Sequence, residues 1–324
     1  MPDSSTAMIL HLQRLSTEDG PGIRTTIFFK GCPLHCMWCH NPESISPRPQ
    51  VQWVETRCIG CGTCLEACPN DTLTRDDDGR IVIDRSRCQG CGACASACPA
   101  NAMELLGKTV RLDELFLELL KDRAYFNPSG GGVTASGGEP TLQAPYTARL
   151  FERLQSEGIH TALDTCGACS LEALERILPQ TNLVMYDLKL MDEDQHRNTT
   201  GQGNKHILSN LLALADMLRK QYPQTALWIR TPLIPGMTTG KQNLSNIGAF
   251  IHENLDGLVE RWELCAFNNL CRDKYRRLGQ HWQFSDTPLM TQSEMDRCGG
   301  YAQSSPFDAS RVLITGAAKT EINP

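Results

Sequence analysis

After residue 110, segments with apolar residues at helical spacing alternate with short continuous apolar runs along most of the chain. Leu112, Leu115, Phe116 and Leu119 lie at helical spacing, so this segment predicts a helix that packs one face against a core. Shorter apolar runs between such segments predict buried strands. The predicted helices cover 112–120, 146–156, 171–178, 207–219 and 241–254. The predicted strands cover 25–29, 133–136, 161–165, 183–187, 226–231 and 262–265, with 311–315 as a candidate last strand.

Short strands that alternate with helices indicate parallel β/α units. Six such strands predict an α/β fold, and we interpret it as a partial (β/α)6 TIM-type barrel. In barrels of this kind the functional side chains gather at the carboxyl ends of the strands. The residues that follow each predicted strand are therefore the first candidates for chemistry.

A cysteine-rich segment, 50–105, interrupts this pattern and contains an internal repeat. The spacing C-x2-C-x2-C-x3-C-P occurs at 58–69 and returns at 88–99, with a predicted hairpin turn at 76–80 between the copies. In bacterial ferredoxin-type runs, the fourth cysteine of each copy ligates the cluster of the other copy. The repeat therefore predicts an inserted ferredoxin-like domain with two complete 4Fe–4S clusters; a pair of structural zinc sites is the alternative. The first predicted ligand set is Cys58, Cys61, Cys64 and Cys98, and the second is Cys88, Cys91, Cys94 and Cys68.

A third group of cysteines follows the first predicted strand. Cys32, Cys36 and Cys39 have the spacing C-x3-C-x2-C, one thiolate short of the four that normally hold a 4Fe–4S cluster. A cluster with three protein ligands leaves one iron free to bind a substrate. We interpret these cysteines as the catalytic centre. A zinc site completed by His35 or His40 is the alternative, although zinc motifs normally pair two C-x2-C knuckles.

The composition of the 324-residue chain limits the remaining classes of function. Eleven of the 16 cysteines fall in the three groups, which argues for metal in a reducing cytoplasm rather than for a secreted disulfide framework. The N-terminus lacks the features of a signal peptide. A net charge of −6 gives no basic footprint for nucleic acid, and no apolar run is long enough to span a membrane. The scattered cysteines, which include the pair Cys166 and Cys169, are interpreted as ordinary buried residues.

The second predicted strand ends in the turn 136–140. Gly137 and Gly138 remove side chains where a ligand could approach the backbone, and the Glu139 carboxylate could hold an ammonium group. An ordinary strand-to-helix turn is the alternative interpretation. The position of this turn after a strand, in a chain with an open cluster site, favours ligand binding.

These motifs together resemble the radical S-adenosylmethionine superfamily. The strings at 19–24, 31–34 and 38–43 narrow the resemblance to the activating enzymes of glycyl radical enzymes, in the subgroup with a two-cluster ferredoxin insert. The resemblance covers about residues 10 to 280. It implies three segments: 1–49 with the first strand and the cluster loop, the insert at 50–105, and the remainder of the barrel with a C-terminal region at 106–324.

The resemblance also implies an activity. The open iron would chelate S-adenosylmethionine, one electron would cleave it to methionine and a 5′-deoxyadenosyl radical, and this radical would take a hydrogen atom from a backbone glycine of a partner enzyme. The implied cofactors are three 4Fe–4S clusters, S-adenosylmethionine and a monovalent cation. The implied partners are a glycyl radical enzyme with its C-terminal glycine loop and a low-potential flavodoxin or ferredoxin, and we expect a monomer.

Further site residues are carried over from the resemblance. Asp164 and Thr165 are similar to the start of the Asp-Thr-Asn-Gly turn of pyruvate formate-lyase activase, which helps to bind the cation. Asp187 would join that site, Lys189 and Arg230 would meet the ligand's carboxylate, and Arg230 would also lie near its ribose. Two departures stand out: Cys166 replaces the Asn of the turn, and Asn268 stands where that activase carries a His. Trp38 could pack against adenine or simply shield the cluster.

Two other classes of function remain as alternatives. One is a radical S-adenosylmethionine maturase or small-molecule enzyme with auxiliary clusters, although maturases of the sulfatase type carry such clusters downstream of the barrel. The other is a non-catalytic ferredoxin-type electron carrier, which would hold three saturated clusters.

Overall fold

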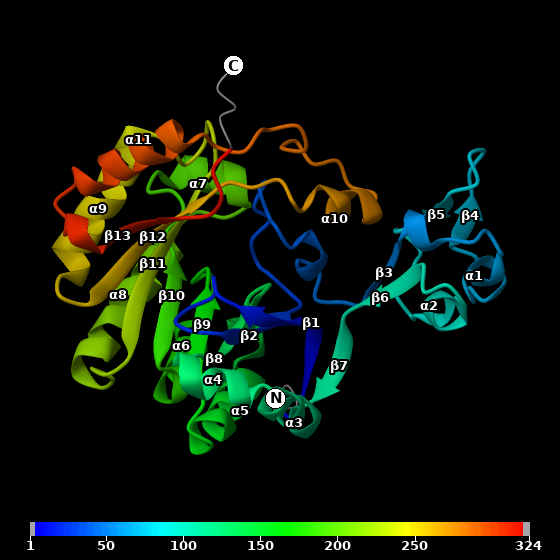
Figure 1. Ribbon diagram of the computed structural model, residues 1–324, viewed down its shortest axis with the longest axis horizontal. Helices are drawn as coiled ribbons and strands as arrows, with labels where there is room; N and C mark the ends of the chain where they lie inside the picture. Colours follow the sequence, from blue (N-terminus) through cyan, green and yellow to red (C-terminus); the bar gives the residue numbers. More distant parts are fainter. Residues whose placement is uncertain (1–3, 320–324) are drawn as a thin grey trace.

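The computed structural model describes residues 4–319 and is built around one nine-stranded sheet. Its strands follow the order β13-β12-β11-β10-β9-β8-β2-β1-β7 (Figure 1). From β2 to β13 each neighbouring pair is parallel, whereas β1 runs antiparallel to both β2 and β7. The strands are β1 (Thr6–Ser16), β2 (Arg24–Phe29), β7 (Lys108–Arg111), β8 (Gly132–Gly137), β9 (His160–Thr165), β10 (Leu183–Asp187), β11 (Ala226–Leu233), β12 (Val259–Ala266) and β13 (Val312–Thr315).

Helices between the parallel strands cover the outer face of the curved sheet (Figure 1). They are α3 (Leu112–Leu120), α4 (Arg123–Ser129), α5 (Ala144–Ser156), α6 (Leu171–Ile177), α8 (Lys205–Lys220), α9 (Lys241–Leu255) and α11 (Gln292–Gln303). Two further helices, α7 (Glu193–Thr200) and α10 (Arg272–Arg277), lie near the carboxyl ends of the strands (Figure 1). Single 3-10 turns lie at Pro42–Ser44, Glu55–Arg57, Pro140–Gln143, Leu178–Gln180 and Ala309–Arg311. Within the residues that the structure describes, no helix is long and apolar enough to cross a membrane.

The predicted strands and helices of the large sheet are confirmed. The helix predicted at 112–120 has the same bounds in the structure, and each of the other predicted elements is present with ends shifted by at most three residues. Strands β1 and β7, and the helices α4, α7, α10 and α11, were not predicted. Because β7 is an edge strand in which Val110 is the one buried residue and the other three are exposed, it offers no apolar run to find.

Residues 50–107 form a small unit beside the large sheet (Figure 1). The antiparallel pair β3 (Gln50–Trp53) and β6 (Met103–Leu106) joins it to the rest of the molecule. A hairpin of β4 (Leu73–Arg75) and β5 (Ile81–Ile83) and the short helices α1 (Thr63–Glu66) and α2 (Ala93–Ala97) complete it. The unit has a hydrophobic core of its own, made of Val51, Cys64, Leu73, Ile81, Cys94 and Met103. The predicted turn at 76–80 is the tip of the β4–β5 hairpin.

Candidate functional site

A cavity of about 340 Å³ lies at the carboxyl ends of the parallel strands. Parallel β/α proteins usually carry their functional residues at this end of the sheet, and the residues predicted from the sequence meet there. Eleven of those residues line it: Cys32, Cys36, Trp38, Cys39, Gly137, Gly138, Asp164, Thr165, Asp187, Lys189 and Arg230. The structure places the other two, Glu139 and Asn268, outside this lining.

The loop that carries Cys32, Cys36 and Cys39 is held by hydrogen bonds from distant parts of the chain. The Cys32 amide donates to the Ile45 carbonyl over 3.0 Å, which closes the loop on itself. Tyr275 donates its hydroxyl to the Cys39 carbonyl (2.9 Å), and Trp282 donates its indole N–H to the Met37 carbonyl (3.0 Å). The rings of Tyr275 and Trp282 stack with centroids 5.2 Å apart. The loop is thus fixed by backbone carbonyls, and its thiols are left for another ligand.

The surroundings of the three thiols differ, and they bear on what the thiols can hold. Burial raises the pKa of Cys36 to about 11 and raises that of Cys39 further. A hydrogen bond with the buried Cys166 side chain lowers the pKa of Cys32. Thiols that are neutral when buried become thiolates only beside positive charge, and the irons of a cluster supply it. The three thiols therefore fit an iron–sulfur cluster. Lys189 adds positive charge beside them, because it lowers the pKa values of Cys32 and Cys36.

Glycine is required where the end of β8 meets the start of the cysteine loop. A Cβ on Gly138 would lie 2.2 Å from the Gly31 carbonyl oxygen, and a Cβ on Gly137, whose φ is +99°, would lie 2.6 Å from Phe28 Cα. The Gly138 amide donates to the Phe29 carbonyl over 2.9 Å. These glycines bring the β8 turn against the loop, which makes them part of the cavity wall.

Glu139 is buried behind this wall and ties two turns together. Its Oε1 accepts hydrogen bonds from the Thr141 amide (3.1 Å) and hydroxyl (2.7 Å) and from the Thr165 hydroxyl (2.9 Å). Its Oε2 accepts from the Cys166 amide (2.8 Å). In this arrangement the carboxylate joins the β8 turn to the β9 turn. Like Glu139, Asn268 bonds to neighbouring protein groups. Its backbone carbonyl contacts His40 Nε2 (3.1 Å), and its side-chain oxygen accepts a hydrogen bond from the Leu270 amide.

Four charged side chains converge on the cavity: three belong to the adjacent strands β9, β10 and β11, and Lys189 follows β10. Lys189 pairs with Asp187, and Arg230 Nη1 lies 3.6 Å from Asp164 Oδ1. Burial alone would lower the pKa of Lys189, but Asp187 and nearby thiols raise it above its ordinary value. Burial raises the pKa of Asp164 to about 6, with Arg230 opposing the shift and Asp187 adding to it. Both cations are therefore charged at neutral pH and face the space beside the thiols.

Sequence reasoning missed two acidic residues of this group. Asp19 lines the cavity and accepts hydrogen bonds from the Ser16 and Thr26 hydroxyls, each over 2.6 Å. Glu263 on β12 forms an ion pair with Arg230, in which Glu263 Oε2 lies 3.0 Å from Arg230 Nε. These two atoms do not form a hydrogen bond with each other. Both stand next to a predicted site element, Asp19 in the string 19–24 and Glu263 in the strand 262–265. Their closeness in the sequence to these segments was the signal that could have identified them as site residues.

Comparison with known proteins identifies the family. Family models of the radical SAM superfamily, a 4Fe-4S dicluster domain and a 4Fe-4S single cluster domain match residues 85–242, 57–102 and 18–77. The chain is 37% identical to the (2S)-3-sulfopropanediol dehydratase activating enzyme of Klebsiella oxytoca, over 90% of this chain and 92% of that one. It is also 37% identical to the trans-4-hydroxy-L-proline dehydratase activating enzyme of Clostridioides difficile, over 93% and 97%.

The chain belongs to the glycyl radical enzyme activating enzymes of the radical SAM superfamily. The benzylsuccinate synthase activating enzyme of Thauera aromatica is a further relative, 38% identical over 84% of this chain and 82% of that one. Among solved structures, a domain of pyruvate-formate lyase-activating enzyme from Bacteroides vulgatus is 24% identical over 58% of this chain and 100% of that one, with a TM-score of 0.45. As an activating enzyme, this protein cleaves S-adenosylmethionine and generates a radical on a partner enzyme.

The eight remaining clustered cysteines of the activating enzyme surround two small cavities in the unit 50–107. One cavity is lined by Cys58, Cys61, Cys64 and Cys98, and the other by Cys68, Cys88, Cys91 and Cys94. These are the two sets in which each run lends its fourth cysteine to the other, so the structure brings together both predicted quartets. Within residues 4–319, no group of three His, Cys, Asp or Glu side chains is arranged to share a single metal ion.

Proposed function

We propose that the activating enzyme holds a 4Fe–4S cluster on Cys32, Cys36 and Cys39 and binds S-adenosylmethionine at the iron that these cysteines leave open. The observation that carries this proposal is the cavity that unites three thiols with two cationic and three anionic side chains. When bound, the cluster supplies the electron that cleaves the sulfonium of the ligand to methionine and a 5′-deoxyadenosyl radical.

The charged side chains of the cavity bind and orient the ligand in this proposal. Lys189 and Arg230 meet its carboxylate, because both are cations that face the space beside the thiols. Asp187, Asp164 and Thr165 hold a monovalent cation next to that carboxylate. Asp164 already accepts a hydrogen bond from the Ser136 hydroxyl (2.6 Å), which orients one oxygen and leaves the other toward Arg230.

The uncharged walls of the cavity exclude water from the reacting bond. Trp38 is 5% exposed and lines the cavity, so its ring can cover the adenine. Gly137 and Gly138 let the ligand approach the backbone. We assign Glu139 and Asn268 to the support of this wall: Glu139 fixes the turn that presents Thr165, and Asn268 fixes His40 beside the cysteine loop.

We further infer that the parallel strands form a partial (β/α)6 barrel and that residues 50–105 are a ferredoxin-like insert with two 4Fe–4S clusters, three in all. The two cysteine-lined cavities and the separate core of this unit support the assignment. A flavodoxin or ferredoxin of low potential is the proposed reductant, and a monomer the proposed state. The reducing cytoplasm remains the proposed compartment, since cysteines that hold iron–sulfur clusters stay available as thiolates where disulfides do not form.

The proposed partner is a glycyl radical enzyme that presents its C-terminal glycine loop to the cavity. The names of the relatives point to dehydratases for sulfopropanediol and hydroxyproline and to benzylsuccinate synthase. This chain is equally similar to all three, at 37% or 38% identity, so the proposal names the partner by its class. The substrate of the partner is therefore best sought from the glycyl radical enzyme encoded beside this chain.

The test is an anaerobic reconstitution with iron and sulfide, followed by dithionite, S-adenosylmethionine and candidate partners. We expect about 12 iron atoms per chain, since each 4Fe–4S cluster holds four, formation of 5′-deoxyadenosine, and a glycyl radical EPR signal with the right partner. Cleavage without a glycyl radical from any plausible partner would favour a maturase of other substrates. A set of three saturated clusters, with no S-adenosylmethionine contact to a unique iron, would favour the electron carrier.

A further inference from the structure

The loop that carries Cys32, Cys36 and Cys39 is called the catalytic loop here. The strand pair β3–β6 fixes how far each cysteine-lined cavity lies from it. In its register Trp53 pairs with Met103 and Val51 pairs with Leu105. The first pair lines the cavity of Cys58, Cys61, Cys64 and Cys98, called cavity 1 here. Val51 lines the cavity of Cys68, Cys88, Cys91 and Cys94, called cavity 2. The two pairs stand two residues apart, about 6.5 Å along the strands.

The end of this strand pair beyond Val51 and Leu105 reaches the catalytic loop. Gln50 Oε1 accepts a hydrogen bond from Lys30 Nζ (3.2 Å), and the same ammonium donates to the Glu43 carbonyl (2.5 Å). Lys30 is 1% exposed and lies two residues before Cys32. Gly107, just after β6, packs against it so closely that a Cβ would lie 2.1 Å from Lys30 Cδ. Both strands therefore run from the catalytic loop past cavity 2 and then to cavity 1.

The loop between the cysteines of cavity 2 also touches the linker that leads to the catalytic loop. A Cβ on Gly90 would lie 2.2 Å from the Pro49 carbonyl oxygen, so the backbones are in direct contact. Gln50, next to Pro49, lines a groove that is also lined by Cys32 and Cys36. Backbone contact at Pro49 and the hydrogen bond from Lys30 to Gln50 thus connect cavity 2 to the loop of the catalytic cysteines.

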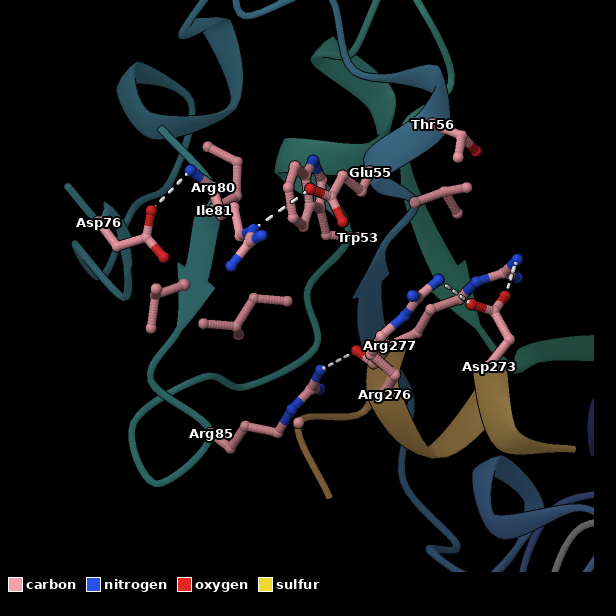
Figure 2. Close-up of a pocket in the computed structure, with 14 residues that line it drawn as sticks. Trp53, Glu55, Thr56, Asp76, Arg80, Ile81, Arg85, Asp273, Arg276 and Arg277 are labelled. Carbon is pink, nitrogen blue, oxygen red and sulfur yellow. Dashed lines mark hydrogen bonds and ion pairs between the residues drawn. The ribbon is translucent and has the colours of Figure 1, made fainter. Parts of the chain in front are cut away.

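A second connection runs through Arg85 and α10. Arg85 donates to the Val51 carbonyl (2.7 Å) and to the Arg277 carbonyl at the end of α10 (2.8 Å). Figure 2 shows this side chain reaching across the cleft between the insert and α10. On the same helix, Tyr275 holds the Cys39 carbonyl, and Lys274 Nζ donates to Asn41 Oδ1 (2.7 Å). Two connections therefore hold Val51, and cavity 2 that it lines, close to the catalytic loop: one through Lys30 and Gln50, and one through Arg85 and α10.

We propose that the insert is a directional relay in which the cluster of cavity 2 is proximal and the cluster of cavity 1 is distal. This inference rests on the proposed function of three clusters. An external one-electron donor protein of low potential loses one electron to the distal cluster. That electron moves to the proximal cluster and then to the catalytic cluster, each hop oxidising one centre and reducing the next. It ends in the sulfur–C5′ bond of S-adenosylmethionine, which breaks to methionine and the 5′-deoxyadenosyl radical.

The test uses the matched variants Cys61→Ala and Cys91→Ala of the full chain. Each removes the second cysteine of its run, and both residues are exposed. The reconstituted proteins are reduced fully, separated from the reductant and mixed with S-adenosylmethionine, and 5′-deoxyadenosine is counted per chain. With one electron stored per cluster, we expect about three equivalents from the wild type, about two from Cys61→Ala and about one from Cys91→Ala. In Cys91→Ala the distal electron is stranded.

The reverse order, with two equivalents from Cys91→Ala and one from Cys61→Ala, would overturn the proposal. One equivalent from all three proteins would overturn it as well, since no relay would exist. Absence of 5′-deoxyadenosine from the wild type in excess dithionite would instead refute the proposed function. Should either variant fail to fold, Cys58→Ala and Cys88→Ala, the first cysteines of the same runs, form an equivalent pair.

A spectroscopic measurement tests the order of the clusters without turnover. In the reduced proteins the magnetic coupling between two clusters falls steeply with their separation. We expect the EPR signal of the catalytic cluster to keep its fast relaxation in Cys61→Ala and to relax as an isolated centre in Cys91→Ala. Fast relaxation retained in Cys91→Ala and lost in Cys61→Ala would place the cluster of cavity 1 nearer and contradict the proposal.

Discussion

The catalytic loop and the insert carry the same ligand atoms in opposite surroundings. The three cysteines of the loop share a cavity of about 340 Å³ with Lys189, Arg230, Asp164 and Asp187. The eight cysteines of the insert close around two small cavities whose other lining residues, apart from Arg75, are uncharged. The difference shows that the number of cysteines alone does not separate a ligand-binding site from a closed cluster site. An open ligand position is useful because space and charge for a second ligand lie beside it.

The largest expected effect comes from removing one thiol on each side of this comparison. Cys36→Ala should abolish cleavage of S-adenosylmethionine, because the open cluster loses a ligand. Cys91→Ala should retain cleavage with dithionite, since that reductant can reach the catalytic cluster without the insert. Formation of 5′-deoxyadenosine measures both. Equal loss in the two variants would mean that the insert has a structural role and would break the comparison.

The charges of the open cavity give the next effect. Lys189→Met should raise the dissociation constant of S-adenosylmethionine by about tenfold to a hundredfold, because a charged hydrogen bond contributes about 1.5–3 kcal/mol. Binding to the reconstituted, oxidised protein measures this constant. Lys205→Met is the control, since that side chain is 82% exposed and pairs with Glu193. An unchanged constant in Lys189→Met would remove Lys189 from the ligand site.

Asp164 makes the open cavity sensitive to pH. Burial raises its pKa to about 6, above the ordinary value of 3.8, so the folded state binds this proton more tightly than the unfolded state does. As the pH falls from 7 to 5, the apo-protein should therefore gain about 1 kcal/mol relative to Asp164→Asn. Over the same range the neutral carboxyl should lose affinity for a monovalent cation. Urea unfolding at the two pH values tests the sign, and parallel curves for both proteins would contradict it.

The smallest effect concerns the support of the loop. Trp282→Phe removes the hydrogen bond to the Met37 carbonyl, which contributes about 1 kcal/mol, and keeps an aromatic ring beside Tyr275. We expect the catalytic cluster to be lost to a chelator several-fold faster while the insert clusters are unaffected. Trp53→Phe is the matched control in the insert, because its indole N–H has no partner among residues 4–319. Equal rates in both variants would argue against a supporting role for Trp282.

The sequence predicted the regular part of the fold and most of the cavity because both follow local patterns. Short apolar runs marked the strands, and cysteine spacing marked the three groups. It did not predict the direction of the Glu139 side chain, since a carboxylate in a turn can face a ligand or the donors of Thr141 and Cys166. Nor did it predict the support from Tyr275 and Trp282, because they bond to backbone carbonyls that every residue offers.

The support of the cysteine loop from residues 275 and 282 has a consequence for biosynthesis. The lining of both insert cavities is contained within residues 51–103, so that unit is complete early in translation. The catalytic loop leaves the ribosome earlier still, yet its contacts with Tyr275 and Trp282 span more than 230 residues of sequence. Because domains fold as units during synthesis, the insert can accept its clusters on the nascent chain. The catalytic loop reaches its final form only when nearly the whole protein has been made.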